Sequence, residues 1–433
     1  MVIEKDEHAA AVRMLSHITA SPTAFHVIAN IKAELDGQDF TELKENEHWD
    51  ISAGGRYYVT RNDSSVIAFI CPEGDYKGFR IMASHSDSPA FKLKDNPGLN
   101  DHGYTRLNVE GYGGMLDAPW FDRPLSVAGR ILIREKSGQI ESRLVNIERS
   151  LLMLPSLAIH MNREANNGYK YNAQKDMLPI YACGENSGDI ISLIAASAGV
   201  DAGSVLGHDL FVYVRDEAVF WGENQEFISS PRLDDQECVW CTLEGFLAAA
   251  DSGSINPGYV PVYCVFDNEE VGSRTKQGAA STFLSDTLER INICTGRNRE
   301  EFFMAASCSF MISADNAHAL HPAHPDKADP ENHTFMNGGI VLKFSARQSY
   351  TTDGVSGAVV KKICEDNSIP LQVFVNRSDI PGGSTLGNIS NTKISMNTAD
   401  IGLAQLAMHS PYESAGTKDV LALIRFSEAF YRS

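Results

Sequence analysis

Two adjacent glutamates, Glu269 and Glu270, are the first residues of this chain whose types and spacing point to catalytic chemistry. They follow an apolar run at residues 259–266, whose β-branched and aromatic side chains predict a buried strand. Open α/β sheets bind their ligands beyond the carboxyl ends of such strands. Neighbouring carboxylates repel each other unless a cation or a shared proton compensates for their charge. The pair therefore predicts a metal ligand beside a general base, with a solvated acidic loop as the alternative.

Other segments carry side chains that could complete a metal site. His85 and Asp87 end an apolar run, and residues two apart on an extended backbone face the same way. Asp87 can then accept the second ring N–H of His85 and orient that ring as a ligand. Asp234, Asp315 and His409 lie near the ends of further predicted elements or near the C-terminus. Each alone has an ordinary alternative, as a surface or core histidine or as a helix cap.

Taken together, five ligand-type residues suit a pair of divalent ions: His85, Asp234, Glu270, Asp315 and His409. One bridging carboxylate, with one histidine and one terminal carboxylate for each ion, provides ligands that suit zinc, and cobalt or manganese are alternatives. Such ions lie roughly 3.5–4 Å apart, lower the pKa of a shared water and polarise a substrate carbonyl. The sequence thus predicts two divalent metal ions per subunit.

These motifs, in this order, resemble the aspartyl aminopeptidase family of dinuclear zinc exopeptidases. The resemblance covers essentially the whole chain, from His85 through the Arg-Leu-Asp, Glu-Glu-Val-Gly-Ser and Ser-Ala-Asp-Asn-Ala-His-Ala segments to His409. It implies that Asp234 bridges the ions and that Glu269 is the general base. It also implies that Asp87 is the outer-shell partner of Glu269 on the other side of the His85 ligand. It also implies an α/β fold: a zinc-exopeptidase-like α/β/α catalytic domain with an inserted β-rich dimerisation domain.

The chain departs from the family pattern at four positions outside the proposed ligand set. The family commonly has histidine at the position of Asn268 and asparagine at that of Asp235. It commonly has arginine where this chain has Ser349 and Tyr412. The metal prediction is unaffected, whereas the fine substrate preference depends on such neighbouring positions.

Further residues are candidates for substrate contacts. His318 lies in a run with His321 and His324, for which we expect outer-shell or substrate contacts rather than metal ligation. Lys343 lies in a mostly apolar strand, and the resemblance implies that it binds an acidic substrate side chain; an exposed edge lysine is the alternative. His160 has the spacing of an ordinary loop histidine, but the matching family residue reaches the active site of a neighbouring subunit.

Composition excludes several classes of function. The 433 residues are 43% hydrophobic and 21% charged, as in a soluble protein with a large core. A net charge of −19 disfavours binding to nucleic acid and to anionic membranes. We find neither a signal-peptide pattern nor an apolar run of the ~18 residues that a membrane helix needs. The scattered cysteines suit a reducing cytoplasm, and Cys238 and Cys241 fall on a helical pattern that predicts core packing.

The turn-rich composition and short recurring strands predict a β-rich insertion between the first and second metal motifs. The resemblance implies that residues 1–90 and 230–433 form a discontinuous catalytic domain and that residues 91–229 form an inserted β-rich oligomerisation domain. After residue 234 the pattern predicts a helix to residue 250, a strand to 266, a helix over 275–294 and a strand over 304–313. A strand over 339–344, a helix over 357–366, a strand over 371–375 and a final helix over 419–431 follow.

The combined interpretation is a cytoplasmic zinc-dependent metalloaminopeptidase that removes N-terminal residues, preferentially Asp or Glu, from peptides. A hydroxide formed by the metals and Glu269 attacks the scissile carbonyl, and Glu269 passes the proton to the leaving amine. We also expect a homo-oligomer, with dimers assembling into a closed dodecamer in which His160 completes a neighbour's site. The alternatives are a neutral or broad residue preference, another amide substrate, or a non-catalytic zinc-binding scaffold, which would have no need of a base beside a ligand.

Overall fold

The computed structural model describes residues 2–184 and 188–433, which form two compact units. The first unit comprises the residues up to Asp87 together with Ala218–Met408 and Glu413–Ser433. The second comprises Ser88–Glu217 and His409–Tyr412. Residues 219–221 and 227–230, at the end of the predicted insertion 91–229, form two strands that pair within the first unit.

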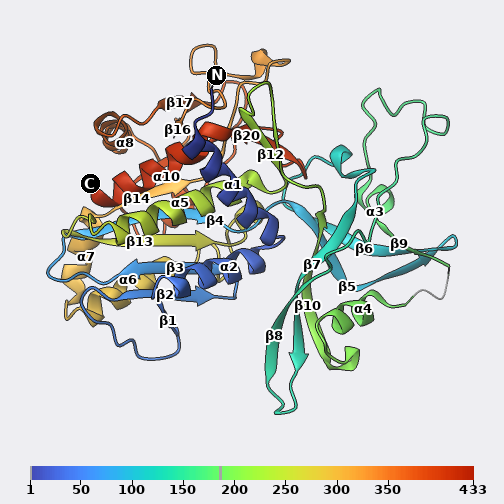
Figure 1. The fold of residues 1–433 in the computed structure, drawn as a ribbon, viewed down its shortest axis with the longest axis horizontal. Helices are drawn as coiled ribbons and strands as arrows, with labels where there is room; N and C mark the ends of the chain where they lie inside the picture. Colours follow the sequence, from blue (N-terminus) through green and yellow to red (C-terminus); the bar gives the residue numbers. More distant parts are fainter. Residues whose placement is uncertain (1, 185–187) are drawn as a thin grey trace. The chain divides into compact units, whose positions relative to one another are not determined.

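The first unit is built on a nine-stranded sheet with the order β1-β2-β3-β13-β4-β14-β18-β16-β17 (Figure 1). Its strands are β1 Thr41–Leu43, β2 Arg56–Arg61, β3 Ser65–Ile70, β4 Gly78–His85, β13 Tyr259–Phe266, β14 Phe310–Ala314, β16 Ile340–Phe344, β17 Leu371–Val375 and β18 Asn397–Gly402. The four neighbours β13, β4, β14 and β18 run parallel. Their carboxyl ends therefore lie at one edge of the sheet, where α/β proteins place their ligand sites.

Helices cover both faces of this sheet (Figure 1), which confirms the predicted α/β/α architecture. One face packs against α1 Lys5–Ala20, α2 Ala24–Gly37, α5 Leu233–Asp251, α8 Gly354–Asp366 and α10 Thr417–Arg432. The other packs against α6 Phe283–Cys294, α7 Arg299–Cys308 and α9 Leu386–Ser390. Tyr263 and Val265 of β13 enter the first core, whereas Val262 and Cys264 enter the second. Burial on both faces explains why this strand is apolar throughout rather than alternating.

Two predicted elements differ from those observed. The helix predicted over 275–294 begins only at Phe283, and the strand predicted over 304–313 is wrong in its first half, where α7 lies instead. The side chain of Asn298 accepts the N–H of Glu301 at 3.1 Å, and the side chain of Glu301 accepts that of Asn298 at 2.7 Å. This reciprocal capping box initiates α7. Cys238 and Cys241 are buried in the core on α5, as predicted.

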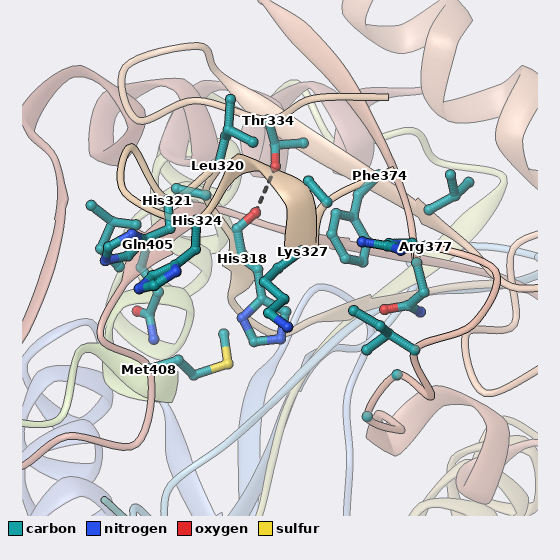
Figure 2. A pocket seen from close by; sticks show the side chains of 18 of the residues that line it. His318, Leu320, His321, His324, Lys327, Thr334, Phe374, Arg377, Gln405 and Met408 are labelled. Carbon is teal, nitrogen blue, oxygen red and sulfur yellow. Dashed lines mark hydrogen bonds between the residues drawn. The ribbon is translucent and has the colours of Figure 1, made fainter. Parts of the chain in front are cut away.

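A smaller five-stranded sheet also belongs to the first unit, with the order β11-β12-β20-β19-β15. Its strands are β11 Val219–Trp221, β12 Phe227–Ser230, β15 Ala317–His318, β19 Ala404–Leu406 and β20 Glu413–Gly416. A pocket beside β15 and β19 is lined by His318, Phe374, Gln405 and Met408, among others (Figure 2). The hydroxyl of Thr334 donates to the carbonyl of His318 at 2.6 Å, which holds the loop after β15 against the strand (Figure 2).

The second unit is an antiparallel six-stranded sheet with the order β8-β7-β10-β5-β6-β9. Its strands are β5 Ala90–Asp101, β6 Tyr104–Tyr112, β7 Leu125–Arg134, β8 Ile140–Asn146, β9 Ile180–Cys183 and β10 Val205–Val214. Two short helices, α3 Ala173–Asp176 and α4 Ile190–Ser197, accompany the sheet. Its separate core includes Trp120, Val127 and Leu210. Across the residues described in both units, we find no helix that combines the length and apolarity needed to span a membrane.

Candidate metal centre

The parallel strands of the first unit carry polar side chains to one edge of the nine-stranded sheet. His85 is the last residue of β4, and Asp315 directly follows β14. Glu269 and Glu270 lie in the short 3-10 turn Glu269–Val271 just after β13. Because β13, β4 and β14 are adjacent and parallel, these residues meet although the chain separates them by up to 230 positions. Asp234 reaches the same place from the start of α5.

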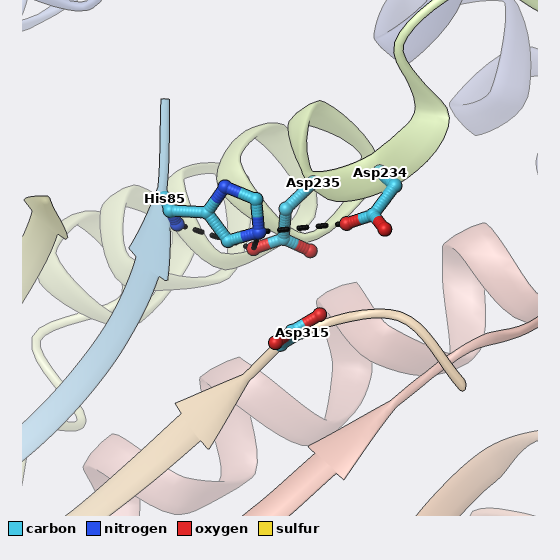
Figure 3. Close-up of side chains that lie close together, drawn as sticks. All are labelled: His85, Asp234, Asp235 and Asp315. Atoms are coloured by element: carbon cyan, nitrogen blue, oxygen red, sulfur yellow. Dashed lines mark hydrogen bonds and ion pairs between the residues drawn. The ribbon is translucent and has the colours of Figure 1, made fainter. Parts of the chain in front are cut away.

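His85 and three aspartates form a compact buried cluster. Nε2 of His85 lies 3.4 Å from Oδ1 of Asp234 and 4.0 Å from Oδ2 of Asp235. Figure 3 shows His85 facing the start of α5, with Asp315 at the end of β14. Potential ligand atoms of His85, Asp234, Asp235 and Asp315 all lie within 4.8 Å of one another. Glu269 and Glu270 form a second such group with His85, so the structure brings most of the predicted site together.

Asp87 connects the histidine to the glutamate turn. Its Oδ1 lies 3.3 Å from Nδ1 of His85, and its carbonyl oxygen lies 3.1 Å from the same nitrogen. Its two carboxylate oxygens accept the backbone N–H groups of Glu269 at 3.1 Å and of Glu270 at 3.2 Å. Acceptors on the Nδ1 side favour the tautomer with the proton on Nδ1. In that tautomer Nε2, which faces the aspartates, is unprotonated and can act as a ligand atom.

The electrostatics of the cluster fit a divalent metal. Burial, with repulsion from Asp234, raises the pKa of Glu270 well above its ordinary value. Burial likewise raises the pKa of Asp235, and it raises that of Glu269 to about 8. Burial alone would lower the pKa of His85, but the surrounding carboxylates raise it well above its usual range. So many buried carboxylates call for positive charge, and an imidazole with several carboxylates is a donor set that zinc accepts.

Lys343 lies in the interior rather than at a sheet edge. Its strand β16 pairs with β17 and β18 on either side, and the residue is 2% exposed. Its ammonium donates to the carbonyl oxygens of Asp315 at 2.7 Å and Asn316 at 3.2 Å. The alternative of an exposed edge lysine is therefore wrong. The contact with an acidic substrate stays a prediction, and the ammonium also anchors the loop that carries Asp315.

The other predicted residues lie on other segments of the chain. His318 lines the pocket of Figure 2, together with His321 and His324. His409 belongs to the segment that groups with the second unit, so its role as a ligand stays a prediction. His160 lies in an exposed turn of that unit, and its proposed action in a neighbouring subunit also stays a prediction.

Sequence reasoning missed one member of the cluster. In the sequence Asp235 stands out only as a departure from the family pattern, yet one of its oxygens accepts the backbone N–H of His85 at 3.1 Å. Its position next to Asp234 was the signal available in the sequence. Neighbouring helical residues usually face different directions, but the backbone at both aspartates is non-helical, so both can face His85.

Comparison with known proteins decides the family. The model of the aminopeptidase I zinc metalloprotease (M18) family matches residues 17–431. The chain belongs to the M18 family. It is a zinc-dependent aminopeptidase, which confirms the resemblance and the enzyme class inferred from the sequence. A probable M18 family aminopeptidase 2 from Clostridium acetobutylicum is 46% identical over 435 residues, covering 99% of each chain.

Solved structures agree with this assignment to the M18 family. Ape4 in a complex with Nbr1 superposes with a TM-score of 0.94 at 34% identity, covering 100% of this M18 chain and 87% of that one. The mApe1 dodecamer of S. cerevesiae superposes with a TM-score of 0.86 at 26% identity, covering 99% of this chain and 97% of that one. A metal cofactor follows from membership of this zinc family, and the His85 cluster is its candidate site.

Proposed function

We propose that this M18 enzyme removes N-terminal residues, preferentially Asp or Glu, from peptides with the help of two divalent ions per subunit. The proposed ligands are His85, Asp234, Glu270, Asp315 and His409, with Asp234 between the ions. Zinc is the proposed metal, with cobalt or manganese as alternatives. The observation that carries the proposal is the buried cluster around His85 beside the glutamate turn.

Glu269 has the environment of a general base. Its pKa, raised to about 8 chiefly by burial, suits a group that takes and returns a proton near neutral pH. Two bound divalent ions would supply Lewis acidity toward the scissile carbonyl and would acidify water. Glu269 removes the proton from the attacking water and returns it to the leaving amine. Asp87 holds the turn in place through the backbone N–H groups of Glu269 and Glu270.

A preference for acidic residues needs a local cation, because the whole chain carries a net charge of −19. Lys343 is one candidate, lying just behind the loop of Asp315. The pocket that follows β15 offers His318, Lys327 and Arg377 as further positive or polar groups. These side chains support the preference for Asp or Glu over neutral residues.

We further propose a homo-oligomer built of dimers that form a dodecamer, in which His160 reaches a neighbouring subunit. The segment around His160 exposes Leu157, Ile159 and Met161 to 57%, 47% and 76%. Exposed apolar side chains that gather in one segment are typical of a surface that another chain covers. The likeness to the mApe1 dodecamer supports the same assembly. A cytoplasmic location is supported by the eight free cysteines among the described residues.

Two experiments test this proposal. The first measures turnover of a panel of amino-acid amides after loading with zinc, cobalt or manganese. We expect the highest kcat/KM on Asp and Glu amides, and equal or higher values on Leu and Ala amides would contradict the substrate preference.

The second experiment replaces the proposed base. Glu269→Gln should bind two metal ions per subunit but lose at least ~10²-fold in turnover, as expected for a missing general base. Glu270→Gln is the matched control and should lose metal as well as activity. If Glu269→Gln lost metal and activity in parallel, Glu269 would be a ligand instead of the base.

A further inference from the structure

Buried side chains connect the two segments that carry Asp234 and Asp315. The connection centres on Asn316, which directly follows Asp315 and is 3% exposed. Its side-chain Nδ2 donates to three acceptors: the carbonyl of Leu233 at 3.1 Å, Oε2 of Glu237 at 3.1 Å and Oε1 of Gln405 at 2.8 Å. Leu233 is the residue before Asp234, so one of these bonds reaches the other ligand-bearing segment directly.

The surroundings of Asn316 admit its side-chain amide in one orientation. Oδ1 accepts from Sγ of Cys238 at 3.3 Å, while Nδ2 faces the three oxygens. An amide nitrogen has two N–H groups, which the three acceptors share. A reversed amide, or a carboxylate in its place, would direct an oxygen against the carbonyl oxygen of Leu233, which can only accept.

A second connection runs from Asn316 to Asp234 through two more buried side chains. Nε2 of Gln405 donates to Oε1 of Glu413 at 3.3 Å, and Oε2 of Glu413 accepts the backbone N–H of Asp234 at 2.9 Å. Gln405 and Glu413 are buried, as is Glu237. We call Asn316, Glu237, Gln405 and Glu413 the Asn316 bridge. It meets the start of α5 at two consecutive residues, the carbonyl of Leu233 and the amide of Asp234.

The backbone around Asp234 needs such an external support. Asp234 and Asp235 have non-helical φ and ψ, so the regular hydrogen bonds of α5 do not determine their position. Asp315, in contrast, is held by the main sheet, where its N–H donates to the carbonyl of Ile401 at 3.0 Å. The Asn316 bridge therefore ties a segment without regular structure to a rigid one.

We propose that Asn316 is a positioning residue that sets the separation between Asp234 and Asp315 and so determines the affinity and geometry of the metal centre. The proposal rests on the proposed function of the His85 cluster as a metal site. Asn316 acts through the ligands and touches no reacting atom. Partners that orient metal ligands in this way change metal affinity by ~10–100-fold when they are removed.

The test compares Asn316→Leu with Asn292→Leu. Asn292 lies on α6 in the other core, is equally buried, and donates to the carbonyls of Arg297 at 3.2 Å and Asn298 at 2.9 Å. Both variants remove the hydrogen bonds of a buried amide, but the partners given for the Asn292 side chain among the described residues, Tyr76, Arg297 and Asn298, carry no proposed ligand. The measurements are the zinc dissociation constant by chelator competition, the visible spectrum of the cobalt-loaded protein and the urea unfolding of the metal-free protein.

We expect both variants to lose stability, whereas only Asn316→Leu should bind zinc ~10–100-fold more weakly and change the cobalt spectrum. Wild-type affinity and spectrum in Asn316→Leu, or equal losses in both variants, would overturn the proposal. Should Asn316→Leu fail to fold, Gln405→Met removes only the second connection and should show the same changes to a smaller degree. Unchanged affinity and spectrum in that variant would overturn it too.

Failure of the metal site itself would look different. In that case the wild-type protein would bind no divalent ion tightly, or Asp315→Asn would bind zinc as well as the wild type. Both results are read from proteins in which the Asn316 bridge is intact, so they separate the site from its positioning.

Discussion

Asp87 offers the sharpest test of how this site is assembled, because one carboxylate supports three groups. It lies 3.3 Å from Nδ1 of His85 and accepts the backbone N–H groups of Glu269 at 3.1 Å and Glu270 at 3.2 Å. Asp87→Ala should therefore affect the orientation of a ligand and the position of the base together. A residue that served only the fold would affect neither.

The size of the effect follows from these contacts. A buried donor that loses its acceptor costs ~1–3 kcal/mol, so the two backbone N–H groups together cost ~2–6 kcal/mol. Glu269 and Glu270 are only partly buried, so water can replace the lost carboxylate. We therefore expect a loss of ~2 kcal/mol in the free energy of unfolding of the metal-free protein. Zinc affinity should fall ~10–100-fold because Nδ1 of His85 loses the carboxylate and keeps only the backbone carbonyl of residue 87 as an acceptor.

The assay combines urea unfolding without metal, the zinc dissociation constant and kcat. Asp353→Ala is the matched control, because Asp353 also accepts two backbone N–H groups, from Val355 at 2.9 Å and Ser356 at 2.8 Å. It caps α8 at the surface, and its loss should cost ~1 kcal/mol without changing zinc affinity. The reasoning is refuted if Asp87→Ala binds zinc and turns over substrate like the wild type, or if both variants weaken zinc binding equally.

Three further outcomes are expected. Lys343→Met should reduce kcat/KM on Asp and Glu amides more than on Leu amides, whereas equal losses would limit the lysine to anchoring the Asp315 loop. Burial raises the pKa of Asp419 to about 7, so its contribution to stability is present below about pH 4 and is lost as the pH rises through 7. The free energy of unfolding in urea should therefore fall less between pH 5 and 9 in metal-free Asp419→Asn than in the wild type. The same dependence of this free energy on pH in both proteins would contradict the prediction. His160→Ala should assemble and bind metal but be nearly inactive, and mixed assembly with Glu269→Gln subunits should restore part of the activity; no recovery would exclude action across subunits.

Local pattern was enough to locate the elements that carry the site. The apolar run of β13 and the polar residues just beyond it identify a buried strand that ends in a ligand loop, because both signals lie within a dozen residues. The same reasoning failed at α7, where Phe302, Ala305 and Ala306 face the core at helical spacing. The predicted strand wrongly included the apolar residues at the end of that helix.

Local pattern could not show which polar groups lie together. The order β13-β4-β14 brings His85, Glu269 and Asp315 to one edge, and that order depends on strand pairing between distant parts of the chain. The interior position of Lys343 also depends on strand pairing, because β16 has a neighbouring strand on each side. The sequence of a strand shows whether the strand is apolar, but it does not show whether other strands flank it.

The sequence by itself determined the chemical types of the site: a histidine, an acidic pair and aspartates at the ends of predicted elements, in an order that resembles one enzyme family. These depend on residue identity and short-range periodicity, which a single chain displays directly. Only the tertiary structure decided that Asp235 joins the cluster and that Asn316 ties the start of α5 to Asp315. These contacts join residues about 80 to 150 positions apart, and they exist only once the sheet has brought its strands together.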